Sequence, residues 1–171
     1  MSATPLRCIV GFLCAIPVVA SAQSEVTLLG YRTTAPSSWV TRAPASSMRL
    51  AEFVAPGAEV IVYFFGKGQG GTVAANTERW KSQFSNPDGA AVYEKVTRDS
   101  SGAFPVTYAE YRGTYARGVG AGDVANAKPG QTLVAAIAET PNGMLFIHLF
   151  GASGTVAAQR DALVTFVKGL H

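Results

Sequence analysis

The sequence has few of the residues that form covalent cross-links and metal sites. It has 171 residues, of which only two are cysteines and two are histidines. Both cysteines, Cys8 and Cys14, lie within the first 22 residues, so the rest of the chain cannot form an internal disulfide. With so few ligands and no His-x-x-x-His spacing, we expect no metal site.

Charge is also scarce, and it is not concentrated in one region. Charged residues make up 15% of the chain, and the formal net charge is +3 at pH 7. Hydrophobic residues make up 48%, which argues against a disordered chain, because disorder requires charge to dominate apolar content. The basic residues are dispersed and form no stripe, so nucleic acid is not expected as a partner.

The N-terminal apolar run is too short to span a membrane. It covers Cys8–Ala20, thirteen residues, whereas a spanning helix needs roughly 18 or more. The run follows a short start with one positive charge, Arg7, and leads into the small-x-small sequence Ala20-Ser21-Ala22. This pattern predicts a secretory signal peptide over residues 1–22, cleaved between Ala22 and Gln23.

Cleavage would leave residues 23–171, a chain of 149 residues with a formal charge of +2, because Arg7 leaves with the signal. A chain of this length buries about 68–70% of its unfolded surface, which is enough for one stable domain without a disulfide. Cys14 follows Phe12-Leu13 rather than small residues, so no lipid anchor is indicated. We therefore expect a single exported domain, periplasmic or secreted, with no membrane span after signal removal.

Strand patterns dominate residues 23–171. Two connections, Ala55-Pro56-Gly57-Ala58 and Pro141-Asn142-Gly143, have the composition of hairpin turns. Residues 116–130 show no periodicity and predict a surface loop. The segments rich in Val, Ile, Tyr and Phe that predict strands are 26–32, 48–54, 59–65, 92–98, 104–115, 132–138 and 144–150.

Two segments have helical periodicity. The first, residues 72–84, carries Val73, Trp80 and Phe84 on one face, and Thr72 is its expected N-cap. Consecutive hairpins with few crossovers imply a mostly antiparallel sheet. The sequence therefore predicts an α+β fold, in which a sheet of about six or seven strands packs against two amphipathic helices. The second helix begins near Ser153, and its apolar stripe is Val156, Leu163, Phe166, Val167 and Leu170.

The segment Gly66–Gly71 (GKGQGG) matches the G-x-G-x-x-G pattern of dinucleotide-binding folds. That interpretation is disfavoured, because the preceding strand belongs to a predicted hairpin and not to a parallel βαβ unit. We expect no cofactor. Two interpretations stay open: a glycine hinge between strand and helix, and an anion site at the helix N-terminus. The candidate ligand-binding residues are Lys67 and Gln69 in the loop and Asn76 and Arg79 in the helix.

No catalytic constellation stands out. His148 lies on a predicted strand and shares a face with Met144, Phe146 and Phe150. A hydroxyl nucleophile needs a neighbouring base and a group that orients it, and the sequence names no partners for His148, so a structural role is favoured. The carboxylates are scattered singly. We assign no catalytic residue, and an enzymatic role stays open without being favoured.

Several motifs carry a resemblance to known proteins: Tyr63–Gly71 (YFFGKGQGG), Asn76, Arg79-Trp80, Phe84 and Pro87-Asp88-Gly89, preceded by Ala35–Trp39 and Ser46–Arg49. In these residues the chain resembles a family of uncharacterised exported bacterial proteins. More distantly, it resembles the PsbP-type α/β sandwich, which is shared by the photosystem II extrinsic subunit and several bacterial envelope lipoproteins. This resemblance implies a binding or assembly role and carries over no catalytic residue. The chain departs from the lipoproteins because it lacks a lipobox.

The leading hypothesis is therefore an exported, non-catalytic protein that binds an envelope protein or a small ligand. It rests on the predicted signal, the missing catalytic set and the resemblance. A cleft or apolar patch would support it. The alternatives are a metal-independent hydrolase, which requires two carboxylates or a His148 triad in a pocket, and a purely structural or assembly protein.

Overall fold

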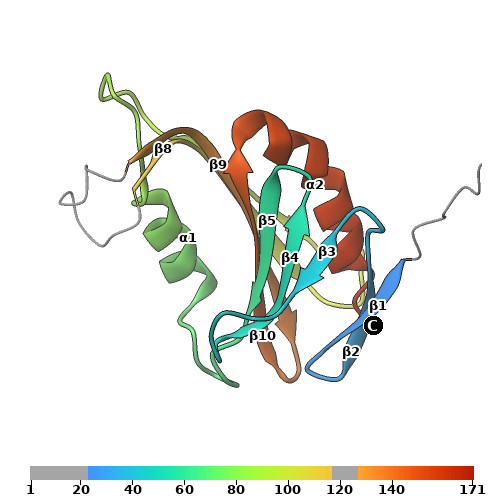
Figure 1. Ribbon diagram of the computed structural model, residues 1–171. Helices are drawn as coiled ribbons and strands as arrows, with labels where there is room; N and C mark the ends of the chain where they lie inside the picture. The colour runs from blue at the N-terminus through green and yellow to red at the C-terminus, as the bar shows by residue number, and fades with distance from the viewer. Residues whose placement is uncertain (1–22, 117–126) are drawn as a thin grey trace, which may run out of the picture.

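The computed structural model describes residues 23–116 and 127–171 (Figure 1). An eight-stranded sheet lies between two helices, and a separate two-stranded hairpin packs on one side. The helices are α1 (Val73–Lys81) and α2 (Ser153–Lys168). The strands are β1 (Ser24–Leu28), β2 (Tyr31–Ala35), β3 (Val40–Arg42), β4 (Arg49–Ala55), β5 (Ala58–Tyr63), β6 (Phe84–Ser85), β7 (Tyr93–Asp99), β8 (Val106–Tyr115), β9 (Lys128–Thr140) and β10 (Gly143–Ala152).

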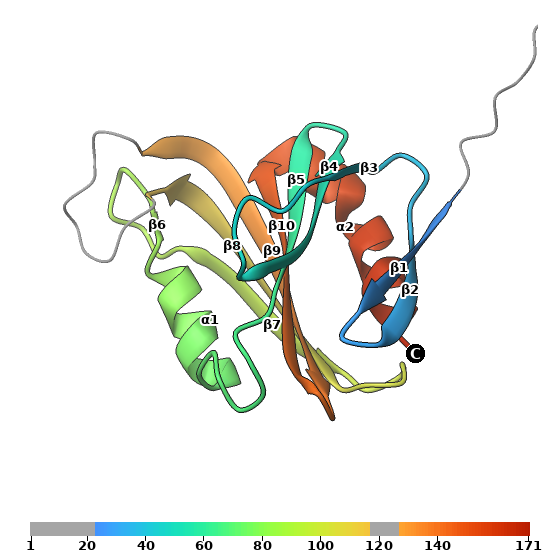
Figure 2. The same cartoon turned by 60° about the horizontal axis from the view of Figure 1, so that its bottom comes forward.

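The large sheet has the strand order β3-β4-β5-β10-β9-β8-β6, and β7 also pairs with β8. All pairings among the described residues are antiparallel. The long strands β9 and β10 form the centre, and α1 and α2 lie on opposite faces (Figure 2). The predicted α+β fold with a mostly antiparallel sheet is therefore confirmed.

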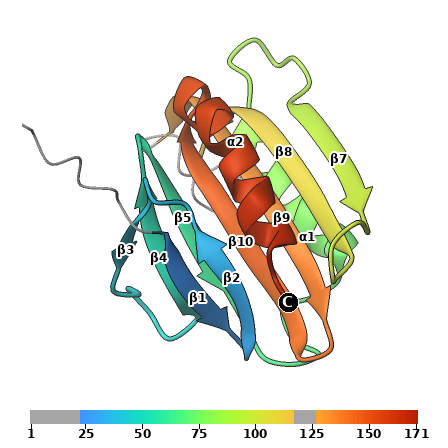
Figure 3. The ribbon, with the colours of Figure 1, turned by 90° about the vertical axis from the view of Figure 1, so that its right-hand side faces the viewer.

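The face toward α2 holds the larger core. Alternate residues of each strand point to it, among them Val60 and Val62 of β5 and Ile147 and Leu149 of β10. The hairpin β1–β2 closes the same face beside α2 (Figure 3). The expected apolar stripe of the second helix lies in this core: Val156, Leu163, Phe166, Val167 and Leu170 are each at most 2% exposed, although Leu170 lies beyond the end of α2 at Lys168.

The opposite face is covered only in part. Helix α1 packs against β8, where the Tyr111 hydroxyl donates a hydrogen bond to the Thr77 carbonyl at 2.8 Å. Trp80 is 1% exposed and packs in a second, smaller core with Phe146. As predicted, the Thr72 hydroxyl caps α1 by accepting from the Ala75 amide at 3.1 Å. Helix α1 contacts the sheet mainly at β8, and part of this face over β5 and β10 stays open.

Several predicted boundaries are wrong. Residues 26–32 are not one strand, because the chain turns at Leu29 and Gly30, which have φ values of +54° and +88°. The first helix ends at Lys81, not 84, and Phe84 instead begins β6, opposite Tyr115. Phe84 stays in the same core as Trp80. The large sheet has eight strands, of which β3 and β6 were not predicted. These two strands have only three and two residues, so they leave no sequence signal.

Some expectations fall outside the described residues. The predicted signal peptide, residues 1–22 with Ala22 at its cleavage site, lies there, and so does most of the predicted 116–130 loop. Within that loop prediction, residues 128–130 form the start of β9. Neither of the two helices in the described part of the chain is long and apolar enough to cross a membrane.

Candidate functional site

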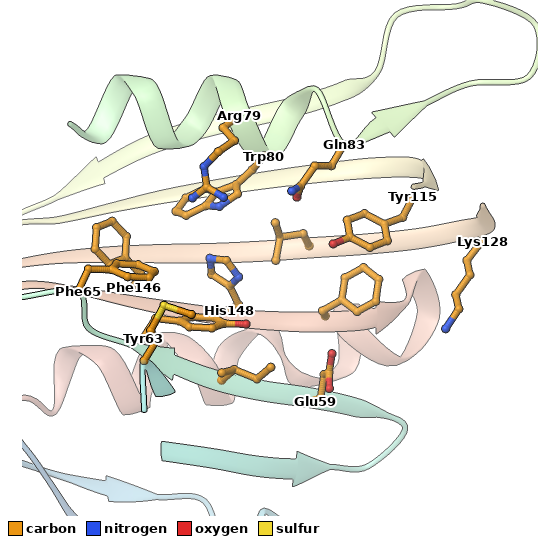
Figure 4. Close-up of a pocket in the computed structure, with 14 residues that line it drawn as sticks. Glu59, Tyr63, Phe65, Arg79, Trp80, Gln83, Tyr115, Lys128, Phe146 and His148 are labelled. Atoms are coloured by element: carbon orange, nitrogen blue, oxygen red, sulfur yellow. The ribbon is translucent and has the colours of Figure 1, made fainter. Parts of the chain in front are cut away.

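A cavity of about 580 Å³ opens on the sheet face that α1 covers only in part (Figure 4). This volume lies within the range of about 300–1,000 Å³ that is typical of small-molecule sites. Side chains from α1, β5 and β10 point into it from different sides. Its fourteen lining residues include a group with aromatic rings: Tyr63, Phe65, Trp80, Tyr115, Phe146 and Phe150.

The strand β10 forms much of the floor of the cavity. Phe146, His148 and Phe150 are alternate residues of this strand, and all three face the cavity. Ile147, which lies between the first two, faces the α2 core instead. Tyr63 of the neighbouring strand β5 lies beside these three residues, with its ring centroid 5.1 Å from that of His148. The floor is therefore built from rings on two neighbouring strands.

Two nitrogens in the cavity wall are buried without a hydrogen-bond partner among the described residues. They are Nε1 of Trp80 and Nε2 of His148. The two rings meet edge to face, with centroids 4.7 Å apart and an interplanar angle of 89°. Buried polar atoms are usually paired, so these two are exceptions, and both belong to side chains that line the cavity.

His148 is held in its neutral form. Burial removes water from the ring and is the main reason that the pKa of His148 falls to about 3, with the positive charge of Arg79 adding to the effect. At neutral pH the floor of the cavity therefore carries no positive charge from this ring.

The charged groups at the cavity are mostly basic. Arg79 and Lys128 line it, and Glu59 is the one carboxylate among its described lining residues. Glu59 also has a basic neighbour outside the cavity, because its Oε2 lies 3.8 Å from Nη2 of Arg42. The cavity therefore has a surplus of positive charge.

A buried carboxylate supports the rim at Met48. Glu52 of β4 accepts hydrogen bonds from the Ala45 amide at 2.6 Å, from Arg49 Nη1 at 2.9 Å and from Arg42 Nη2 at 2.8 Å. The Ala45 amide, followed by Arg49, lowers the pKa of Glu52 to about 2. The ionised carboxylate thus fastens the segment before β4, which includes Met48, to the sheet.

The four candidate residues predicted from the sequence lie in two places. Arg79 lines the cavity, and its Nη2 donates to Oδ1 of Asn76 at 2.7 Å. Asn76 is buried, and its Nδ2 donates to the carbonyls of Gly70 at 2.7 Å and Thr72 at 2.9 Å. Lys67 and Gln69 line a separate hollow beside the β9–β10 turn.

The sequence reasoning missed most of the cavity. Tyr63, Phe65 and Trp80 are expected in the core on sequence grounds, because aromatic side chains pack in cores by default. The alternation that placed His148 with Phe146 and Phe150 was available as a signal, and it identified the correct face. The placement of α1 over β8, which leaves part of that face open, was not visible in the sequence.

The described lining residues do not bring together either of the two catalytic sets named above, a carboxylate pair or a His148 triad. Among the described residues that line the cavity, no second carboxylate accompanies Glu59, and His148 has no carboxylate bonded to it. The strand before the glycine segment, β5, pairs antiparallel with β4 and β10, so the segment does not lie in a parallel βαβ unit.

Comparisons with known proteins identify the fold. Neither the protein-family models nor the curated proteins include a match to the chain. Solved structures do match, among them the solution structure of cyanobacterial PsbP (CyanoP) from Synechocystis sp. PCC 6803. That protein is 14% identical, with a TM-score of 0.58 over 93% of this chain and 98% of its own. The predicted PsbP-like similarity is confirmed at the level of the fold, which does not by itself indicate a function.

Proposed function

We propose that this protein is an exported, non-catalytic binding protein whose small ligand occupies the cavity between α1 and strands β5 and β10. The observation that carries the proposal is the cavity itself: about 580 Å³, lined by aromatic rings and by the basic side chains of Arg79 and Lys128. An open, largely apolar hollow with a few polar groups is the usual form of a small-molecule site. The predicted signal peptide supports a role outside the cytoplasm.

A neutral fluorescent probe tests the proposal without any assumption about charge. N-phenyl-1-naphthylamine becomes fluorescent in apolar surroundings, and we expect the protein of residues 23–171 to bind it in a saturable way. The variant Gln83→Trp adds a large ring at a position that lines the cavity. It should weaken probe binding by about tenfold or more, because the ring takes up space that the probe needs.

The matched control is Ser82→Trp. Ser82 is exposed and adjacent to Gln83, but it is not among the cavity residues. This variant adds the same ring outside the cavity and should leave probe affinity unchanged. Equal binding by wild type and Gln83→Trp, or no saturable binding by wild type, would contradict the proposal.

A further inference from the structure

The cavity has one end shaped for a flat ring. Phe65 and Phe146 meet at 5.5 Å between centroids and at an angle of 60°, and Trp80 meets Phe146 at 6.4 Å and 81°. Trp80 and Phe146 are each 1% exposed, so the ring surface that is open at this end belongs mainly to Phe65, which is 39% exposed, and to the half-buried Tyr63. Tyr63 lies beside them, nearly parallel to Phe65 at a centroid distance of 6.1 Å. An aromatic guest matches this end better than a flexible chain does.

The same end carries a positioned cation. The guanidinium of Arg79 lies 5.7 Å from the centre of the Trp80 ring and is bonded to Asn76, whose own side chain is tied to the Gly70 carbonyl. A guanidinium has five N–H donors, so the single bond to Asn76 leaves others for a guest. Because Arg79 is already held, binding costs little further side-chain entropy.

Lys128, the second basic residue of the cavity, does not lie near the aromatic end. Lys128 lies at the other end of the cavity from the Phe65–Phe146 pair (Figure 4), at the start of β9. The carboxylate of Glu59 lies toward that end as well. The positive charge near the aromatic rings therefore comes from Arg79, with no carboxylate of the described lining residues beside it.

From this arrangement we infer that the ligand is an aromatic carboxylate, with its ring against Phe65 and Tyr63 and its carboxylate on Arg79. The inference rests on the proposed function, since it names the ligand class of the same cavity. A carboxylate and a guanidinium form strong, paired hydrogen bonds.

Two probes of nearly equal shape separate the contribution of the carboxylate charge to binding from that of the aromatic ring. 1-Naphthylacetate carries a carboxylate, and 1-naphthylacetamide is its neutral counterpart. We expect wild type at pH 7 to bind the carboxylate at least about tenfold more tightly than the amide, as measured by calorimetry. Arg79→Gln should remove most of this preference and leave the affinity for the amide within about twofold, which also shows that the variant is folded.

Lys95→Gln is the control for net charge. Lys95 is exposed on β7 and does not line the cavity, so this variant should keep the full preference. Equal binding of the two probes by wild type overturns the inference and leaves the proposed function standing. A preference that survives Arg79→Gln also overturns it. Binding of neither probe overturns both the inference and the proposed function.

Discussion

At the scale of single residues, His148 makes stability depend on pH. Its pKa is about 3 in the folded protein and about 6.5 in the unfolded chain, so the unfolded chain binds more protons between these values. The free energy of unfolding should therefore fall as pH falls from about 6.5 toward 3, by up to about 1.4 kcal/mol per pH unit. His148→Gln should flatten this slope.

Urea unfolding between pH 5 and 6.5 isolates the effect of His148. Glu52 and Asp99 also have lowered pKa values in the folded protein, so their contribution is lost only as pH falls toward and below their unfolded values near 4. Above pH 5 they add little to the slope. Identical slopes for wild type and His148→Gln would show that the ring is not desolvated as the structure indicates.

At the scale of elements, the glycine segment before α1 affects both the stability of the fold and the shape of the cavity. Gly70 has a φ of +89°, and a Cβ there would lie 2.9 Å from Phe146 Cε2 and 3.0 Å from Phe65 Cδ2. Gly70→Ala should lower the free energy of unfolding by about 2–4 kcal/mol, because backbone strain and overpacking add. Gly68 has a φ of +73°, but a Cβ there would meet no atom within 4 Å. Gly68→Ala therefore adds backbone strain alone and should lower the free energy of unfolding by about 1–2 kcal/mol.

Thermal unfolding and probe binding of the two variants check this prediction together. Only Gly70→Ala should also weaken binding of the naphthyl probes, because Phe65 and Phe146 line the cavity. Equal losses of stability for Gly68→Ala and Gly70→Ala would mean that the close approach to the rings is unimportant.

Sequence reasoning succeeded for elements whose signals are local. The Thr72 cap and the apolar stripe of α2 follow from neighbouring residues, and both were predicted. It failed where tertiary contacts decide. Phe84 continues the helical face of Trp80 in sequence, yet it lies in β6, where it pairs with Tyr115 of β8. Arg79 was predicted to bind a ligand, but the cavity beside it depends on which strands α1 covers, and no local pattern encodes that placement.

At the scale of the whole molecule, residues 170 and 171 join distant parts of the chain. Leu170 is 1% exposed in the α2-face core, and the backbone of His171 exchanges two hydrogen bonds with Arg32 of β2, at 2.9 and 3.0 Å. Leu170→Ala should lower the free energy of unfolding by about 2–4 kcal/mol. His171→Ala keeps the backbone bonds and should change it by less than about 0.5 kcal/mol. Urea unfolding of both variants measures the difference.

The side chains of β10 point alternately to the α2-face core and to the cavity. Its odd-numbered residues from 145 to 149 belong to the α2-face core, and its even-numbered residues from 146 to 150 face the cavity. If the cavity holds a ligand as proposed, a change at an even position alters both the cavity and the second core, in which Phe146 is buried beside Trp80, whereas a change at an odd position alters the α2-face core. The strand would then record folding alone in its odd positions, and folding together with ligand choice in its even positions.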